Sequence, residues 1–266
     1  MHSRCVYPTE VALPFSKVTP DALSTGKCGV CASHGTTSKY LECKSLDSGF
    51  ARLWICSNCF AIYNSTAEDR EMDVLDWQKK WSQIDDFYSV PPPQEFEAAL
   101  KNHGAVFDFF SKDLDRQFSG SYLEVGAGGG MMAAAAATRF QVANVFDHVT
   151  DRLNQVKERV GDHYRIVSAD EIASLETDTV LIWHAMEHFL DPGAVFELCA
   201  KTLKPGGLFF IQVPVLSYEH VYPGHYYFYC ERSFEVLAKN NNLNILKFYY
   251  DHAMNTMTVA LQANTV

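Results

Sequence analysis

The 266-residue chain lacks any apolar run long enough to cross a membrane. Its first 20 residues also lack the basic start and the apolar stretch of a secretory signal. Basic residues are scarce: 22 Lys and Arg stand against 32 Asp and Glu, which gives a formal net charge of -10. Nucleic-acid partners are therefore disfavoured, because proteins that bind them usually carry a basic surface that neutralises phosphates. These absences predict a cytoplasmic protein whose partner is neither a membrane nor a nucleic acid.

Four of the eight cysteines form two Cys-x-x-Cys pairs, Cys28 with Cys31 and Cys56 with Cys59. Two such pairs supply the corners of a tetrahedral thiolate site, which predicts a zinc ribbon. A cytoplasmic chain disfavours disulfides and a redox pair needs only one such motif, which leaves a rubredoxin-like iron site as the main alternative. A ribbon this small depends on its metal to fold, so we expect a structural role. Three other cysteines are expected to be packed free thiols: Cys43, Cys199 and Cys230.

Prolines divide the N-terminal part of the chain. We expect residues 1–64 to hold an extended arm and then the ribbon, and residues 65–94 to form a helical connector that includes a triple proline. Residues 95–266 form the main predicted domain. Apolar residues at helical spacing predict core-packing helices over 94–110, with a break near Gly104.

A glycine-rich turn at residues 126–130 is the central feature of this domain. An apolar pattern around Glu124 predicts a short buried strand before it, and the alanine-rich residues 131–137 predict a helix after it. Glycines allow the backbone to approach a ligand closely, and amides at the helix start present donors. No Lys-Ser or Lys-Thr follows the glycines, which excludes a P-loop, and the dinucleotide fingerprint fits only loosely. The turn is therefore predicted to bind a nucleotide of another kind.

Three later segments extend the pattern. Residues 142–147 are an apolar run that ends in Asp147, where an acid after the second strand of a parallel sheet accepts from ribose hydroxyls. Residues 178–192 are a second apolar strand followed by Met-Glu-His and Asp-Pro, and residues 203–214 begin with Leu-Lys-Pro-Gly-Gly. Strands alternate with helices throughout, which predicts a parallel sheet covered on both faces. Residues 243–262 then predict an antiparallel hairpin.

In this order the segments resemble class I methyltransferases that use S-adenosylmethionine (SAM), in the branch that acts on small molecules. The resemblance covers residues 95–263. It implies an α/β, Rossmann-like seven-stranded sheet with its last strand reversed, SAM as the cofactor and a small-molecule acceptor, such as a sugar or a secondary metabolite. Sugar C-methyltransferases also carry an N-terminal four-cysteine zinc module before a core of this type. The cofactor contacts that we predict on this basis are Glu124, Gly126, Ala127, Gly128, Gly130, Asp147, His148, Asp170 and His184.

Methyl transfer from a sulfonium is a direct displacement, so such an enzyme must mainly align the acceptor and exclude water. Oxygen and acidic-carbon acceptors also need a base. His188 follows the fourth strand, and the loop at residues 218–229 holds two histidines and five tyrosines. The resemblance places a histidine of this loop over the acceptor, which makes His225 the predicted base or orienting residue, with Tyr222 and His188 behind it. A tyrosine-rich cover packed on the sheet is the alternative interpretation.

Two other functions compete with a small-molecule enzyme. An RNA or protein methyltransferase could grip its substrate with the ribbon, but residues 28–59 contain only three basic side chains: Lys39, Lys44 and Arg52. A non-catalytic scaffold could keep the fold and bind a partner. Glu124, the glycine turn and Asp147 are all present, which argues against that scaffold.

Overall fold

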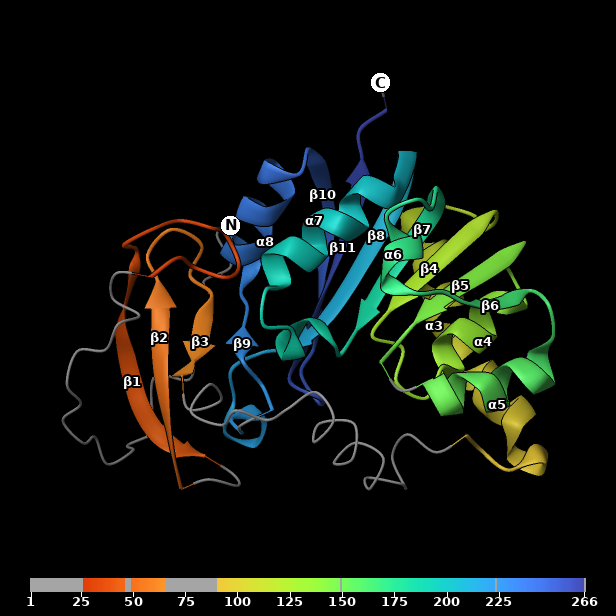
Figure 1. Ribbon diagram of the computed structural model, residues 1–266, viewed down its shortest axis with the longest axis horizontal. Coiled ribbons are helices and arrows are strands. Elements are labelled where there is room, and N and C mark those ends of the chain that lie inside the picture. Colours follow the sequence, from red (N-terminus) through yellow and green to blue (C-terminus); the bar gives the residue numbers. More distant parts are fainter. Residues whose placement is uncertain (1–25, 46–48, 66–89, 149, 223, 266) are drawn as a thin grey trace. The chain divides into compact units, whose positions relative to one another are not determined.

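The computed structural model describes residues 26–45, 49–65, 90–148, 150–222 and 224–265 (Figure 1). The predicted arm and nearly all of the predicted helical connector lie outside these residues. Contacts group the described residues into two compact units. The glycine-turn unit holds residues 90–183 and 201–210, and the ribbon unit holds residues 26–65, 184–200 and 211–264. No helix in the described part of the chain is long and apolar enough to span a membrane.

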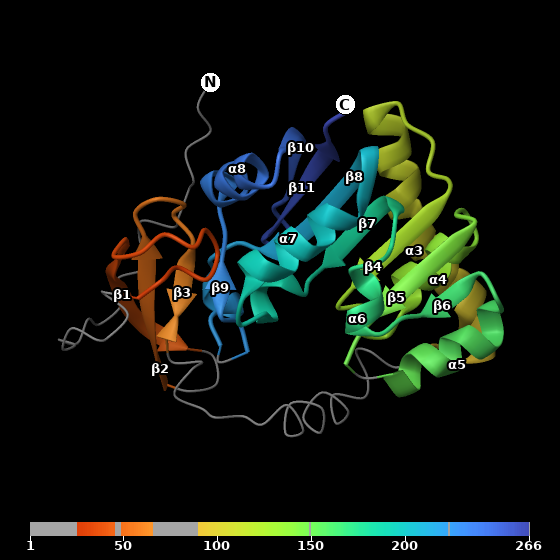
Figure 2. The same cartoon turned by 45° about the horizontal axis from the view of Figure 1, so that its top comes forward.

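The glycine-turn unit is built on parallel strands. These are β4 (Ser121–Val125), β5 (Val142–Phe146), β6 (Tyr164–Ile166) and β7 (Thr177–Trp183). β4 pairs in parallel with β5 and β7, and β5 pairs in parallel with β6. The helices are α3 (Pro93–Leu114), α4 (Met131–Ala137), α5 (Thr150–Val160) and α6 (Ala169–Ile172). Figure 2 shows α3 and α4 on the same face of these strands, with α4 in contact with α3, β5 and α5.

The parallel strands belong to a seven-stranded sheet with the order β10-β11-β8-β7-β4-β5-β6. Its other members are β8 (Leu203–Pro214), β10 (Leu243–Asp251) and β11 (Thr256–Ala263). β10 and β11 pair antiparallel as the predicted hairpin, so the sheet is mixed. This confirms the predicted seven-stranded α/β sheet. One boundary differs: β8 begins at Leu203, so the Leu-Lys-Pro-Gly-Gly segment lies within the strand rather than before it.

The predicted break in the first helix is wrong. α3 continues through Gly104, which is buried on the helix face that packs in the unit. A Cβ at Gly104 would lie 2.6 Å from Nη2 of Arg139, and the same guanidinium binds Asp108 at 3.0 Å. Gly104 therefore makes room for a neighbouring side chain and leaves the helix intact.

The ribbon unit contains a four-stranded antiparallel sheet with the order β1-β2-β3-β9. Its strands are β1 (Thr37–Ser45), β2 (Gly49–Cys56), β3 (Ile62–Asn64) and β9 (Tyr227–Phe228). The rest of the unit includes α7 (Pro192–Thr202) and α8 (Glu231–Asn240). β9 comes from the tyrosine-rich loop, because Ile62 pairs with Phe228 and Tyr63 with Tyr227. The ribbon and this loop therefore share one sheet.

The ribbon strands and the later segment also share one buried apolar cluster. Cys43 and Leu53 from the ribbon strands are buried together with Leu216, Val221 and Phe228 from the later segment. Cys43, Cys199 and Cys230 are buried and form no disulfide among the described residues, as predicted. Apolar packing from two distant parts of the sequence thus closes the ribbon.

Candidate functional site

The glycine turn follows β4 and precedes α4. Gly126, Gly128 and Gly130 have φ values of 78°, 54° and 73°, a region that side chains with a Cβ rarely adopt. The amides of Gly126 and Ala127 donate to the carbonyl of Phe146 at 2.9 and 3.2 Å, which ties the turn to the end of β5. The backbone conformation predicted from the glycines is therefore present.

Asp147 directly follows β5 and lies against this turn. Its Oδ2 accepts a hydrogen bond from the amide of Gly128 at 2.8 Å, and its side chain is half-buried. A carboxylate after the second strand of a parallel sheet is the usual acceptor for ribose hydroxyls. The structure thus brings the glycine turn and Asp147 together, and a contact of Asp147 with the cofactor remains a prediction.

Glu124 lies at the end of β4 but is only 2% exposed. Its carboxylate accepts from the hydroxyl of Tyr122 at 3.2 Å and from the amide of Ala133 in the first turn of α4. Burial raises the pKa of this carboxyl to about 8. These contacts hold the strand to the helix that follows the turn. The predicted contact of Glu124 with the cofactor remains a prediction.

The other predicted cofactor residues lie in different surroundings. His148 is exposed and packs edge-on against Phe146, with ring centroids 5.4 Å apart. Asp170 is exposed in the first turn of α6. His184 belongs to the ribbon unit, where its Nδ1 lies 3.8 Å from Oε1 of Glu187. His184 is thus brought together with the predicted acceptor residues.

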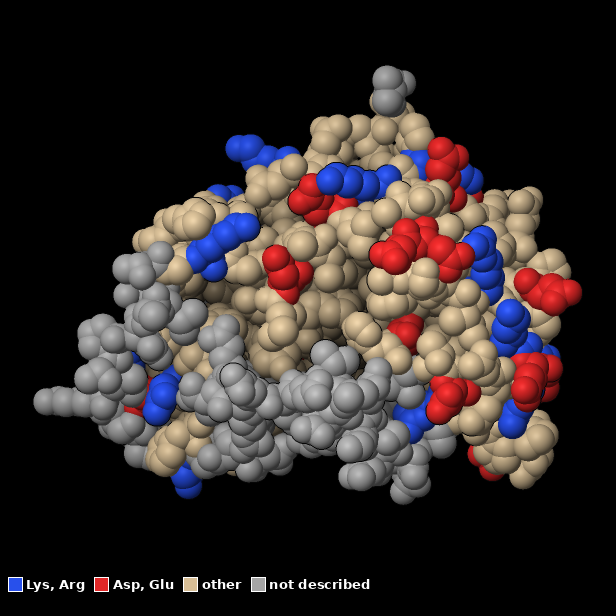
Figure 3. All heavy atoms as spheres, viewed as in Figure 1, with Lys and Arg blue, Asp and Glu red and all other residues tan. Residues whose placement is uncertain are grey.

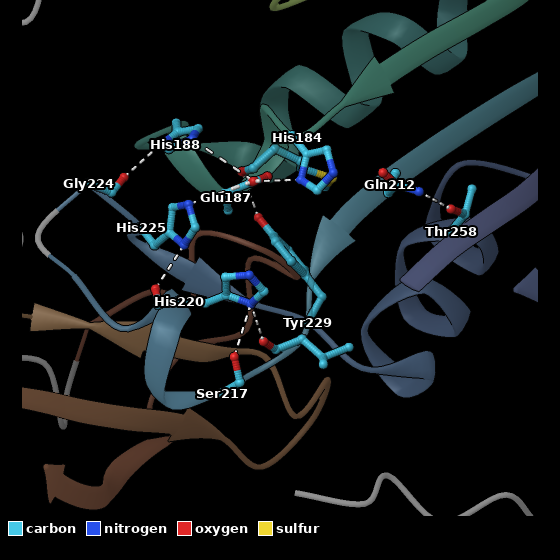
Figure 4. Close-up of polar contacts among 12 residues, drawn as sticks. His184, Glu187, His188, Gln212, Ser217, His220, Gly224, His225, Tyr229 and Thr258 are labelled. Atoms are coloured by element: carbon cyan, nitrogen blue, oxygen red, sulfur yellow. Dashed lines mark hydrogen bonds and ion pairs between the residues drawn. The ribbon is translucent and has the colours of Figure 1, made fainter. Parts of the chain in front are cut away.

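Those residues belong to a histidine cluster, which we define as His184, Glu187, His188, Tyr222 and His225. Figure 4 shows the three histidines and Glu187. Glu187 is at its centre and only 1% exposed. Its Oε1 lies 3.9 Å from the Nε2 atoms of both His188 and His225. Sequence reasoning selected His188, His225 and Tyr222 and ranked Glu187 below them. The sequence signal that pointed to Glu187 was its position between His184 and His188.

Backbone carbonyls fix both imidazoles. Nδ1 of His188 lies 2.7 Å from the carbonyl of Gly224, and Nδ1 of His225 lies 2.9 Å from the carbonyl of His220. Because a carbonyl only accepts, each Nδ1 carries the proton and donates it. Nε2 of His225 then accepts from the hydroxyl of Tyr222 at 2.7 Å.

The charges within the cluster follow from its burial. Burial lowers the pKa of His225 to about 3, so this imidazole is neutral at neutral pH. Burial raises the pKa of Glu187, but the contact with His184 and the neighbouring imidazoles outweigh it and hold that pKa below its ordinary value. An imidazole with so low a pKa is a weak base. The low pKa and the contact with Tyr222 therefore favour a role in which His225 orients the hydroxyl of Tyr222.

The four predicted zinc ligands also converge, in the ribbon unit. Sγ of Cys28 lies 3.8 Å from Sγ of Cys59, and Sγ of Cys31 lies 3.7 Å from Sγ of Cys56. All four thiols are buried and free, and their sulfurs lie within 4.8 Å of one another. Sulfurs held at about 2.3 Å from a tetrahedral zinc ion are about 3.8 Å apart, whereas a disulfide needs about 2.05 Å. The cluster therefore fits a four-thiolate metal ion.

The electrostatics of the thiols agree with that geometry. The hydrogen bond from Cys59 lowers the pKa of Cys28 to about 5, whereas burial raises the pKa of Cys56. Four buried thiols cannot all ionise without a cation among them, because each thiolate opposes the next.

The fold and the glycine turn define a methyltransferase. The model of a family described as a methyltransferase domain matches residues 101–247, more than half of the chain. The chain therefore belongs to this family, which confirms the class predicted from the sequence.

Relatives agree with this family. A ubiquinone biosynthesis O-methyltransferase from Xanthomonas oryzae pv. oryzae is 31% identical over 112 residues, which cover 39% of this chain and 46% of the relative. The chain thus spans about half the length of such curated relatives. Among solved structures, a SAM-dependent methyltransferase from Clostridium acetobutylicum has a TM-score of 0.51 at 14% identity. The match covers 70% of this chain and 98% of the chain of that methyltransferase.

A second solved structure is the 1,6-didemethyltoxoflavin-N1-methyltransferase of Burkholderia thailandensis, with its substrate and S-adenosylhomocysteine bound. Its TM-score is 0.53 at 17% identity, and the match covers 71% of this chain and 86% of that one. At these identities the two structures support the fold alone.

Proposed function

We propose that this protein transfers a methyl group from SAM to a small-molecule acceptor. The observation that carries the proposal is the hydrogen bond between Asp147 and the amide of Gly128, in the turn between β4 and α4 of a methyltransferase-family sheet. SAM supplies the methyl group when it is bound. The glycine turn would hold its polar end, and Asp147 would accept from its ribose.

The class of acceptor is inferred from the relatives and from the surface. One relative is named for the biosynthesis of ubiquinone, and one structural neighbour is named for 1,6-didemethyltoxoflavin. Ubiquinone and 1,6-didemethyltoxoflavin are both small molecules. On the face shown in Figure 3, basic and acidic side chains are interspersed over the described residues, and no broad basic area is visible there. A small acceptor suits this surface better than a nucleic acid does.

We assign the acceptor to the histidine cluster. His188 comes soon after β7 and His225 lies in the loop after β8, and ligands of open α/β sheets bind beyond the carboxyl ends of such strands. In this arrangement the hydroxyl of Tyr222 faces the acceptor while His225 orients it.

The experiment that tests the proposal is a calorimetric titration of the full chain with SAM. Asp147→Ala should weaken binding by about 1.5–3 kcal/mol, as for other hydrogen bonds to a charged group. Asp162→Ala, an exposed acid in the same unit, is the matched control and should bind SAM normally. Wild-type protein that fails to bind SAM would refute the function, and unchanged affinity in Asp147→Ala would remove Asp147 from the site.

The acceptor assignment needs a second readout, the release of S-adenosylhomocysteine with a panel of hydroxylated and amine-bearing small molecules. His225→Ala should keep SAM affinity and lower turnover, by about 10²- to 10⁴-fold for a general base and by less for an orienting residue. We expect the smaller loss because the pKa of His225 is so low. A variant that folds but loses SAM binding would instead place His225 in the cofactor site.

For the cysteine cluster we propose one structural zinc ion, bound by Cys28, Cys31, Cys56 and Cys59. The sulfur spacing supports a four-thiolate ion, and zinc is the usual metal of ribbons with paired cysteine knuckles. A tetrahedral iron site has the same ligands, so metal analysis of the purified chain decides between them.

A further inference from the structure

The histidine cluster has the composition of a second metal site. We propose that Glu187, His188 and His225 bind a divalent transition-metal ion, separate from the one in the cysteine cluster. One ligand atom from each of these residues lies within 4.8 Å of the other two. All three residues belong to the ribbon unit, and Figure 4 shows the imidazoles of His188 and His225 on one side of the carboxylate and that of His184 on the other.

The distances leave little to adjust. Oε1 of Glu187 lies 3.9 Å from Nε2 of His188 and 3.9 Å from Nε2 of His225. Nitrogen and oxygen ligands at about 2.0–2.2 Å from a tetrahedral ion are about 3.4 Å apart. Each of these two pairs therefore needs to close by only about half an ångström, and the ligand atoms of His188 and His225 lie within 4.8 Å of each other.

The orientation of the rings is that of metal-binding histidines. A histidine that binds a metal through Nε2 usually donates its Nδ1 proton to a carboxylate or a backbone carbonyl. His188 donates in this way to Gly224, and His225 to His220. Two carbonyls thus select the tautomer that turns Nε2 toward Glu187.

The burial of Glu187 is an independent argument for a bound cation. Glu187 is 1% exposed, and among the described residues its buried Oε2 has no hydrogen-bond partner. A buried carboxylate with an oxygen that lacks a partner is costly, and a cation bound to either oxygen of Glu187 lowers that cost by offsetting the charge that the two oxygens share. The competing explanation is a protonated imidazole, but Oε1 lies 3.8 Å from Nδ1 of His184 and 3.9 Å from Nε2 of both His188 and His225, and these distances are longer than a hydrogen bond.

The ligand set limits which metal can bind. Two imidazoles and one carboxylate suit zinc, iron, cobalt or manganese, whereas magnesium and calcium prefer oxygen ligands alone. Tyr222 donates to Nε2 of His225 at 2.7 Å in the metal-free protein, and an ion on that atom would replace this hydrogen bond. With the ion bound, His225 would hold the metal instead of orienting the phenol, which would remain beside the site. Three protein ligands leave a position open, as in catalytic zinc sites.

An open position on such an ion accepts an oxygen donor. If the acceptor binds in this cluster, which rests on the proposed function, the site favours a hydroxylated small molecule that ligates the ion through its oxygen. An amine without a neighbouring hydroxyl would gain less from this ion.

Cobalt titration of the full, chelator-treated chain tests the site without any assay of activity. Co²⁺ in the cysteine cluster gives intense sulfur-to-metal charge-transfer bands, whereas Co²⁺ bound by nitrogen and oxygen gives only weak visible bands. We expect two ions per chain, one with each spectrum, and zinc that displaces both. Uptake of a single ion with thiolate bands only would overturn the proposal.

Variants locate the second ion. Glu187→Gln should remove the second ion and keep the thiolate-bound one. If Glu187→Gln fails to fold, His188→Gln replaces it as the test variant and should give the same result. His163→Gln changes an exposed imidazole and should keep both ions. Two ions in His188→Gln would refute the ligand set. SAM titration of the same samples separates the proposals, because wild-type protein that binds SAM but only one ion overturns the metal site alone.

Discussion

Gly130 is the position where the glycine turn is tested most directly. It has a φ of 73° at the start of α4, and a Cβ there would lie 2.3 Å from the hydroxyl of Tyr164 and 2.8 Å from Cδ2 of Leu153. The left-handed backbone costs a residue with a Cβ about 1–2 kcal/mol, and overpacking of a buried site costs about 1–3 kcal/mol more. Leu153 and Tyr164 are both fully buried, so both costs apply and we expect Gly130→Ala to lose about 2–5 kcal/mol of unfolding free energy.

Gly161→Ala is the matched control for this change. Gly161 has a φ of 89°, but a Cβ there meets nothing within 4 Å, so only the backbone cost of about 1–2 kcal/mol remains. Thermal melting measures the difference, since 1 kcal/mol shifts the melting temperature by about 2–4 °C in domains of 150–250 residues. Gly130→Ala should melt clearly below Gly161→Ala and bind SAM more weakly. Equal melting temperatures would refute the packing argument.

Two further predictions concern Glu124 and the cysteine cluster. Burial raises the pKa of Glu124 from 4.5 to about 8, so the folded state keeps a proton that the unfolded state releases. Stability of the SAM-free protein should fall from pH 4.5 to about pH 8, and Glu124→Gln should flatten that fall; an unchanged slope would contradict the assignment. Cys56→Ser should lose the thiolate-bound metal and destabilise the ribbon, whereas Cys43→Ala should keep its metal; a folded, metal-free wild type would refute the zinc proposal.

The sequence was informative wherever the signal is local. The strand, glycine turn and helix around residues 122–137 follow from apolar periodicity and from backbone freedom at glycine, and the structure reproduces them. The paired cysteines are equally local, since each pair is one tight turn. Asp147 was selected because a carboxylate after the second strand has a known place in a parallel sheet; the structure places it against the glycine turn, and its contact with ribose remains a prediction.

What the sequence could not supply depends on contacts between distant residues. Gly104 leaves space for the guanidinium of Arg139 and does not break the helix, and no pattern within the helix predicts that neighbour. Glu187 is central because three imidazoles from two segments surround it. Its flanking histidines were visible, but the approach of His225 was not.

The contact between the ribbon and the tyrosine-rich loop could not be predicted from the sequence, and it gives the ribbon a role in positioning that loop. Asn64, at the end of β3, donates its side-chain amide to the carbonyls of Tyr222 and His225 at 3.3 and 3.2 Å, and its backbone amide to Tyr226 at 2.8 Å. The ribbon strand therefore holds the backbone of the residues that we assign to the acceptor. If zinc binding supplies most of the folding free energy of the ribbon, it also fixes this loop, so a metal ion that touches no substrate would still set the geometry of the acceptor site.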